Sequence, residues 1–168
     1  MPEKHFVRPS VATQDFGYQI KNNETFHIIT CGRFVPLKGF DLAINAFARF
    51  IEKLPKNAQA HVKLTLVGKG PEEKLLKKLI LKNNVINHVE IINWIERSKL
   101  IKKMQNADLF LFPSHEGAGM VVAEALSCGL PIICLDNCGP GEFITPQCGI
   151  KIRPQSYKNT TYKLAQAI

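Results

Sequence analysis

No stretch of this 168-residue sequence stays apolar for the roughly 20 residues that a membrane-spanning helix requires. The first residues, Met-Pro-Glu-Lys-His, lack the charged-then-apolar layout of a secretory signal peptide. There is also no internal repeat and no low-complexity tract. These absences argue against a membrane-spanning or repeat protein, and the length is that of one ordinary domain.

Cysteine is present in an odd number, with five residues scattered at positions 31, 128, 134, 138 and 148. This pattern favours reduced thiols, so we expect a cytoplasmic protein, either free or peripheral at the inner face of the membrane. Cys134 and Cys138 have the close spacing of metal ligands, but no His or further Cys nearby completes a zinc-type set. The sequence therefore predicts no metal site.

The charge balance is basic, with a formal net charge of +8, and 45% of the residues are hydrophobic, enough for a core. A basic surface attracts nucleic acid, anionic lipid or phosphorylated ligands. The interleaved aromatic and basic residues of single-strand binders are missing, so we expect no nucleic-acid partner. Solvated helix faces explain the same charge, since the lysines at 74, 77 and 78 lie on a predicted helix.

Apolar runs and helical periodicity alternate along the chain. This alternation predicts an α/β fold, a Rossmann-like parallel sheet wrapped by helices. Residues 1–25 show no clean period and are interpreted as a leading or interdomain segment before a domain at 26–168. Strands are predicted at 26–31, 62–67, 89–92, 107–113, 131–135 and around 150–152, and helices at 40–54, 71–81, 98–104, after residue 119 and at the C-terminal end.

Ligands of such sheets bind beyond the carboxyl ends of the strands. Glycines, cations and acids gather at the predicted strand ends, which favours one binding site at that edge. The residues concerned are Gly32-Arg33 with Lys38, Gly68-Lys69-Gly70, Asn93-Trp94, Ser114-His115-Glu116, and Asp136-Asn137 with Gly139, Gly141 and Glu142.

One of these ends opens the stretch from Ser114 to Gly129. Its small residues 117–119 let the backbone approach a ligand closely, and the helix start that follows favours a phosphate. Glu116 and Glu124 lie eight positions apart around this helix start. Because carboxylates accept hydrogen bonds from sugar hydroxyls, the stretch predicts a ligand with both phosphates and hydroxyls.

The Glu-x7-Glu spacing with Gly in the spacer, followed by Glu-Ala-Leu-Ser-Cys-Gly-Leu-Pro, resembles the donor-sugar signature of family 4 glycosyltransferases. These are retaining enzymes of the GT-B fold. The similarity covers residues 27–168, nearly all of the family's C-terminal donor-binding domain, and implies that these 168 residues do not include the N-terminal acceptor domain. The resemblance implies transfer of a hexose from a UDP-, GDP- or ADP-sugar, with retention, to a glycan or lipid-linked acceptor in surface polysaccharide biosynthesis. It implies no cofactor or metal, and an isolated domain that is inactive alone.

The resemblance also implies catalytic roles for three residues. Arg33 and Lys38 would stabilise the leaving diphosphate in the place of a metal, and Glu116 would lie near the reacting carbon. Glu124 would hold the ribose. The alternatives are loop charges for the two cations, a capping acid for Glu116 and a surface helix position for Glu124.

Further donor contacts follow from the same resemblance. The loops at Gly68–Pro71 and Trp94-Ile95 would flank the base, with a core or interface position as the alternative for Trp94, and His115 would make a polar contact. For the whole chain, a non-catalytic nucleotide- or sugar-binding module and a nucleotide-sugar epimerase of related fold remain alternatives. The predicted donor-binding set is Gly32, Gly68, Gly70, Trp94, His115, Gly117, Ala118, Gly119, Met120 and Glu124.

Overall fold

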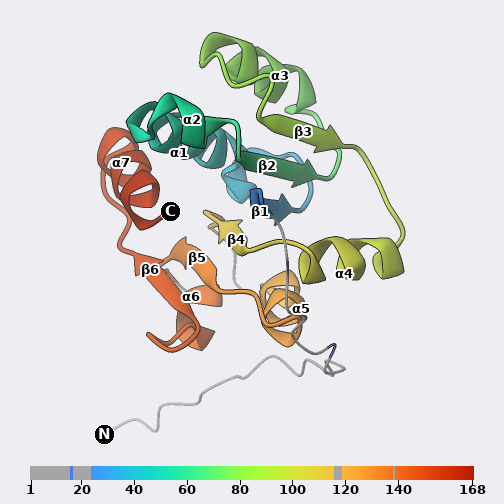
Figure 1. The fold of residues 1–168 in the computed structure, drawn as a ribbon. Coiled ribbons are helices and arrows are strands. Elements are labelled where there is room, and N and C mark those ends of the chain that lie inside the picture. Colours follow the sequence, from blue (N-terminus) through green and yellow to red (C-terminus); the bar gives the residue numbers. More distant parts are fainter. Residues whose placement is uncertain (1–15, 17–23, 116–118, 138) are drawn as a thin grey trace, which may run out of the picture.

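The computed structural model describes residues 16, 24–115, 119–137 and 139–168. Within these residues, one parallel sheet has the strand order β3-β2-β1-β4-β5-β6. The predicted Rossmann-like sheet is therefore confirmed, and Figure 1 shows it running through the middle of the molecule. The strands are β1 (Phe26–Cys31), β2 (Val62–Val67), β3 (Val89–Ile92), β4 (Leu109–Phe112), β5 (Ile132–Leu135) and β6 (Gly149–Ile152).

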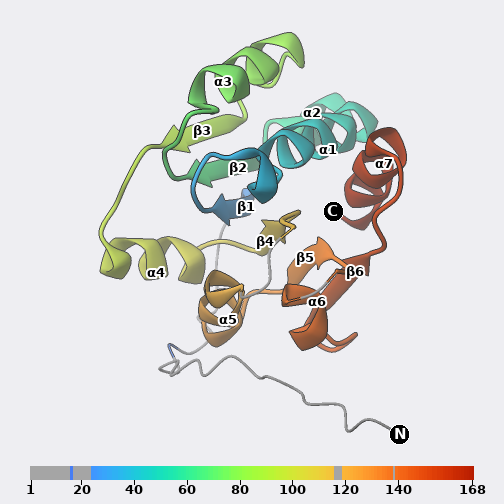
Figure 2. The same cartoon turned by 180° about the vertical axis from the view of Figure 1, so that it is seen from behind.

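Helices cover both faces of the sheet, as Figures 1 and 2 show from opposite sides. In β4, Leu109 and Leu111 join the core that packs under α1, α3 and α7, whereas Phe110 and Phe112 join the core under α4 and α5. This alternation follows from the two-residue period of a strand. The helices are α1 (Phe40–Lys53), α2 (Lys56–Gln59), α3 (Glu73–Lys82), α4 (Arg97–Gln105), α5 (Met120–Ser127), α6 (Pro140–Phe143) and α7 (Tyr157–Ala167), with a 3-10 turn at Pro36–Lys38.

The predicted boundaries of three strands match the structure, but the predicted start of α3 is wrong. We expected Pro71 to be the first helical residue, whereas the helix begins at Glu73. The backbone N–H of Glu72 donates to the carbonyl of Phe34 at 3.1 Å, which holds residues 71 and 72 in a turn against the loop after β1. The short helices α2 and α6 were not predicted, because four residues cannot display a helical period.

The sheet is joined least extensively between β1 and β4. Strand β1 pairs with β2 along its whole length, from Phe26 to Cys31, but with β4 only at Ile28 and Ile29. The chain order also reverses here, with β2 and β3 on one side of β1 and β4 to β6 on the other. This is the topological switch point at which ligands of open parallel sheets bind.

One described residue of the predicted leading segment, Phe16, contacts the domain. Its backbone N–H donates to the carbonyl of Ser127 at 3.1 Å, and its carbonyl accepts from Nε2 of Gln105 at 2.8 Å. Its side chain packs partly buried against the core under α4 and α5. The boundary at residue 25 remains a prediction. Among the described residues, every helix is too short or too polar to cross a membrane.

Candidate functional site

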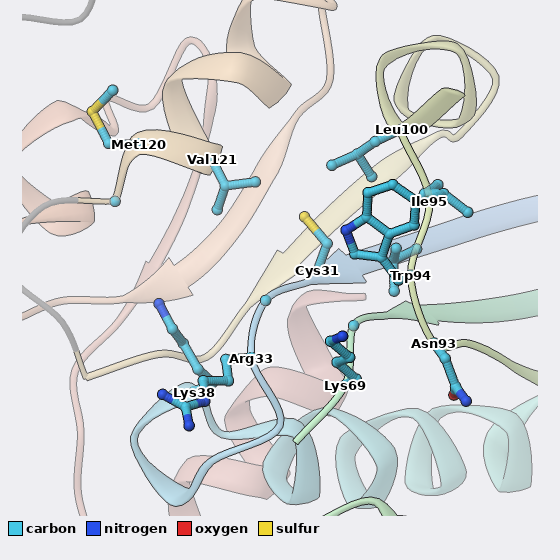
Figure 3. Close-up of a pocket in the computed structure, with 14 residues that line it drawn as sticks. Cys31, Arg33, Lys38, Lys69, Asn93, Trp94, Ile95, Leu100, Met120 and Val121 are labelled. Atoms are coloured by element: carbon cyan, nitrogen blue, oxygen red, sulfur yellow. The ribbon is translucent and has the colours of Figure 1, made fainter. Parts of the chain in front are cut away.

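A cavity of about 590 Å³ opens at the carboxyl edge of the sheet, between the ends of β1, β2 and β3 and the starts of α4 and α5 (Figure 3). Its volume lies within the roughly 300–1,000 Å³ typical of small-molecule sites. The structure therefore has a cavity at the carboxyl edge of the sheet, where the sequence predicted a binding site. The lining residues are Cys31, Gly32, Arg33, Lys38, Val67, Gly68, Lys69, Asn93, Trp94, Ile95, Leu100, Gly119, Met120 and Val121.

The loop after β1 brings both predicted cations to this cavity. Arg33 is exposed, whereas Lys38 is half-buried, and burial lowers the pKa of Lys38 below its ordinary value. The Nζ atom of Lys38 lies 5.8 Å from the centroid of the Phe112 ring. In Figure 3 the amine of Lys38 points toward the start of α5. A partly desolvated ammonium group in this position gains electrostatically from a bound anion.

Beside these cations, the cavity wall is formed by two closely packed backbone loops, the loop after β1 and the loop after β2. A Cβ atom on Gly68 would overlap the carbonyl oxygen of Gly32, and one on Gly70 would overlap the carbonyl oxygen of Phe34. Gly68 has a φ of 153°, and its N–H donates to the carbonyl of Ile92 at 2.8 Å. Both predicted glycines are thus required for the close approach of the loops after β1 and β2, and Gly68 also lines the cavity.

Helix α5 starts at the cavity. Its N-cap is Gly119, which has a φ of 58° and no side chain with which to cap the helix. Gly119, Met120 and Val121 line the cavity, so the N-terminal end of the helix dipole faces it. Glu116, Gly117 and Ala118 lie outside the described residues, and their predicted roles remain predictions.

The opposite end of the cavity is apolar and aromatic. Trp94, on the loop between β3 and α4, is 69% exposed and lines the cavity together with Ile95 and Leu100. This exposure excludes a core position for Trp94, whereas an interface position remains the alternative. Figure 3 shows these three side chains clustered on one side of the cavity, where the flat indole ring of Trp94 lies next to two aliphatic side chains.

Glu124 does not line the cavity but lies one helical turn beyond Val121, which does. Its Oε1 atom accepts a hydrogen bond of 2.9 Å from Nε of Arg97, the first residue of α4. Burial, followed by the charge of Glu124, raises the pKa of Cys31 at the cavity wall to about 12. Sequence reasoning missed Arg97. Arg97 directly precedes the helix predicted at 98–104, and a cation at a helix start is opposed by the helix dipole, which was the signal available in the sequence.

His115 is exposed and lies outside the residues that line the cavity. Its backbone N–H donates to the carbonyl of Leu37 at 2.8 Å. The amide Nδ2 of Asn137 donates to the carbonyl of Ser114 at 3.0 Å and lies 3.3 Å from Nδ1 of His115. These bonds tie the ends of β4 and β5 to the loop after β1, and the predicted polar contact of His115 with the donor remains a prediction.

Comparison with known proteins assigns the chain to a family. The family model described as "Glycosyl transferases group 1" matches residues 12–168. The chain belongs to this family. The resemblance to a GT-B glycosyltransferase domain is confirmed, whereas assignment to family 4 and retention of configuration remain predictions.

Related sequences carry glycosyltransferase names. The GDP-mannose-dependent monoacylated alpha-(1-6)-phosphatidylinositol monomannoside mannosyltransferase of Corynebacterium glutamicum is 33% identical over 138 residues, covering 77% of this chain and 34% of that protein. The GtfA subunit of the UDP-N-acetylglucosamine–peptide N-acetylglucosaminyltransferase of Streptococcus agalactiae is 31% identical, covering 67% of this chain and 21% of its own length. The 168 residues thus span about a third or less of these group 1 glycosyltransferases.

Solved structures of glycosyltransferases share the fold. The pneumococcal O-GlcNAc transferase GtfA, in complex with UDP and GlcNAc, superimposes with a TM-score of 0.76 and 25% identity, covering 86% of this chain and 28% of that one. WaaG, a glycosyltransferase involved in lipopolysaccharide biosynthesis, gives a TM-score of 0.70 and 28% identity over 85% of this chain and 38% of its own. The predicted fold, that of the C-terminal domain of a GT-B glycosyltransferase, is therefore confirmed.

Proposed function

We propose that the chain is the donor-binding half of a retaining family 4 glycosyltransferase, and that its cavity binds a nucleotide sugar. One observation carries the proposal: the cavity at the switch point has a cationic end, at Arg33 and Lys38, and an aromatic end, at Trp94. A nucleotide sugar has the matching polarity, with a diphosphate next to a nucleoside.

The ligand fits the cavity in one direction. The base lies against the apolar surface of Trp94, Ile95 and Leu100, and the diphosphate lies between Lys38 and the N-terminal end of α5. The ribose falls between these ends, on the side of Glu124, and the hexose follows the diphosphate. The complex of pneumococcal GtfA with UDP and GlcNAc supports a nucleotide and a sugar as ligands of this fold.

In the proposed reaction the bond between the sugar carbon and the diphosphate breaks, and an acceptor hydroxyl forms the new bond on the same face of the sugar. The acceptor proton passes to the departing phosphate oxygen. Negative charge grows on the diphosphate during this step, and Lys38 and Arg33 offset it without a metal. In this proposal Glu116 is the acid that interacts with the sugar near its reacting carbon.

The acceptor is a glycan or its lipid-linked precursor, handled in the cytoplasm or at the inner face of the membrane during surface polysaccharide biosynthesis. The names of two relatives support a GDP-sugar or a UDP-sugar as the donor, because one relative depends on GDP-mannose and the other is named for UDP-N-acetylglucosamine. Since the acceptor of a GT-B enzyme sits on the other domain, we expect the 168-residue chain alone to bind donor without transferring it.

A thermal-shift panel of UDP, GDP, ADP and CMP tests the proposal. A ligand at 100 times its Kd stabilises a protein by about 2.7 kcal/mol, so the matching diphosphate should raise Tm clearly above the monophosphate CMP. Failure of all three diphosphates to stabilise the chain would contradict nucleotide binding. Robust sugar transfer by the purified chain alone would contradict its assignment as a donor-binding half.

A further inference from the structure

The ion pair between Arg97 and Glu124 joins the two helices that form one wall of the cavity. Nε of Arg97 donates to Oε1 of Glu124 at 2.9 Å across 27 positions of sequence. The side chain of Arg97 is 66% exposed, whereas that of Glu124 is only 19% exposed. The guanidinium group therefore holds a mostly buried carboxylate from its solvent side.

Arg97 is unfavourably placed for its own helix. It is the first residue of α4, where the helix dipole favours an anion and disfavours a cation. Lys99, two residues further on, pairs within its own segment with Glu96 at 3.8 Å. The contact that compensates Arg97 is thus the carboxylate of α5 rather than a neighbour on α4.

The pair lies beside the part of the cavity wall that α4 and α5 form. Leu100 on α4 and Val121 on α5 both line the cavity, and each is three residues from a member of the pair. Residues three apart share one side of a helix. Figure 3 shows Leu100 and Val121 reaching toward the cavity from their two helices, with Cys31 between them. Cys31 lines the same cavity, and the charge of Glu124, after burial, contributes to raising the pKa of the Cys31 thiol.

We propose that Arg97 is a positioning residue for the ribose: it holds the Glu124 carboxylate in the orientation that accepts hydrogen bonds from the ribose hydroxyls. This inference rests on the proposed nucleotide-binding function. A carboxylate has lone pairs on both oxygens, so pairing through Oε1 leaves Oε2 able to accept from a diol. Arg97 also offsets a negative charge that would otherwise repel the neighbouring diphosphate.

The test compares ribonucleotide with dideoxynucleotide. Calorimetric titration measures the affinity of whichever of UDP, GDP or ADP binds best, and of its 2′,3′-dideoxy counterpart. Hydrogen bonds to a charged group contribute about 1.5–3 kcal/mol, so the natural chain should prefer the ribonucleotide roughly tenfold or more. Arg97→Ala should reduce this preference to about threefold or less, and Arg97→Lys should retain an intermediate preference.

Two further variants isolate the effect. Glu124→Gln should also lose the preference, and Arg97→Ala added to Glu124→Gln should then change it no further, as expected for residues that act as one unit. Lys99→Ala removes one positive charge from the same helix without touching Glu124, and it should keep the full preference. Circular dichroism spectra of all variants check that the fold is retained.

Each contrary result has its own meaning. An Arg97→Ala variant that keeps the full preference, or that weakens both nucleotides equally, overturns the positioning role while nucleotide binding stands. Equal binding of the two nucleotides by the natural chain overturns the ribose assignment of Glu124 and the role of Arg97 with it. No binding of either nucleotide overturns the proposed function itself.

Discussion

The wall of the cavity that follows β1 and β2 is held by backbone, whereas the wall formed by α4 and α5 is held by side chains. On the first wall, Gly68 and Gly70 fit against the carbonyl oxygens of Gly32 and Phe34, and backbone hydrogen bonds connect the loops. On the second, the ion pair of Arg97 with Glu124 and the apolar contacts around Leu100 connect the helices.

The wall held by backbone contacts and the wall held by side-chain contacts should respond differently to substitution. Backbone contacts that tolerate no added Cβ fix the loop that carries Arg33 and Lys38, the cations proposed to face a diphosphate. Side-chain contacts between separate helices can be changed one residue at a time without displacing the backbone, so we expect substitutions on this wall to alter binding selectively. The comparison predicts large structural effects from changes on the first wall and selective binding effects from changes on the second.

The largest effect should come from Gly68→Ala. Its Cβ would overlap the Gly32 carbonyl oxygen, so the loops must separate, and overpacking of this kind costs about 1–3 kcal/mol of stability. Chemical denaturation should show this loss, and nucleotide binding should fail. Gly32→Ala is the matched control, because its φ of 154° is nearly the same but its Cβ would lie 3.6 Å from Cδ of Lys38. Equal loss in both variants would attribute the effect to the dihedral angle and not to overlap.

Lys38→Ala and Arg33→Ala should each weaken a nucleoside diphosphate roughly tenfold or more while changing the affinity for the free nucleoside little. The reason is that both cations lie at the end of the cavity assigned to the phosphates. Calorimetric titration with both ligands measures the difference. Lys74→Ala, an exposed lysine of α3 outside the cavity, is the control. Equal losses of affinity for the two ligands would contradict the assignment of Lys38 and Arg33 to the diphosphate.

Trp94→Ala should have a smaller and more selective effect. An aromatic pair contributes about 0.5–1.5 kcal/mol, so nucleoside and nucleoside diphosphate should both weaken by up to roughly tenfold. Because Trp94 is exposed, stability should hardly change. Trp94→Phe keeps a ring and should recover much of the affinity. Unaltered binding by Trp94→Ala would contradict the placement of the base at this end of the cavity.

Phe16→Ala should have the smallest effect. Its side chain is only partly buried against the core under α4 and α5, so the variant should lose about 1 kcal/mol of stability in chemical denaturation. Nucleotide affinity should change less than twofold, since Phe16 does not line the cavity. A larger fall in affinity would show that Phe16 influences the cavity wall formed by α4 and α5.

The sequence predicted what depends on local pattern. Alternating strands and helices, the cations after β1 and the glycines after β2 all lie where parallel-sheet geometry requires them. The pairing of Arg97 with Glu124 was beyond such reasoning, because residues 27 positions apart meet only once the sheet has set α4 beside α5. The exposure of Trp94 likewise depends on the loop that carries it and not on its neighbours in sequence.

The central claim is that a nucleoside diphosphate binds in the cavity between these two walls, and amide chemical-shift mapping tests it most directly. The protein has a single tryptophan, so the indole N–H of Trp94 gives one assignable signal. On titration with the best of UDP, GDP and ADP, we expect the largest shifts at Gly32, Gly68, Gly119 and this indole, and none at Ile86, which follows α3 and lines a separate cavity. Saturable shifts at Ile86 with an unmoved Trp94 indole would contradict the account.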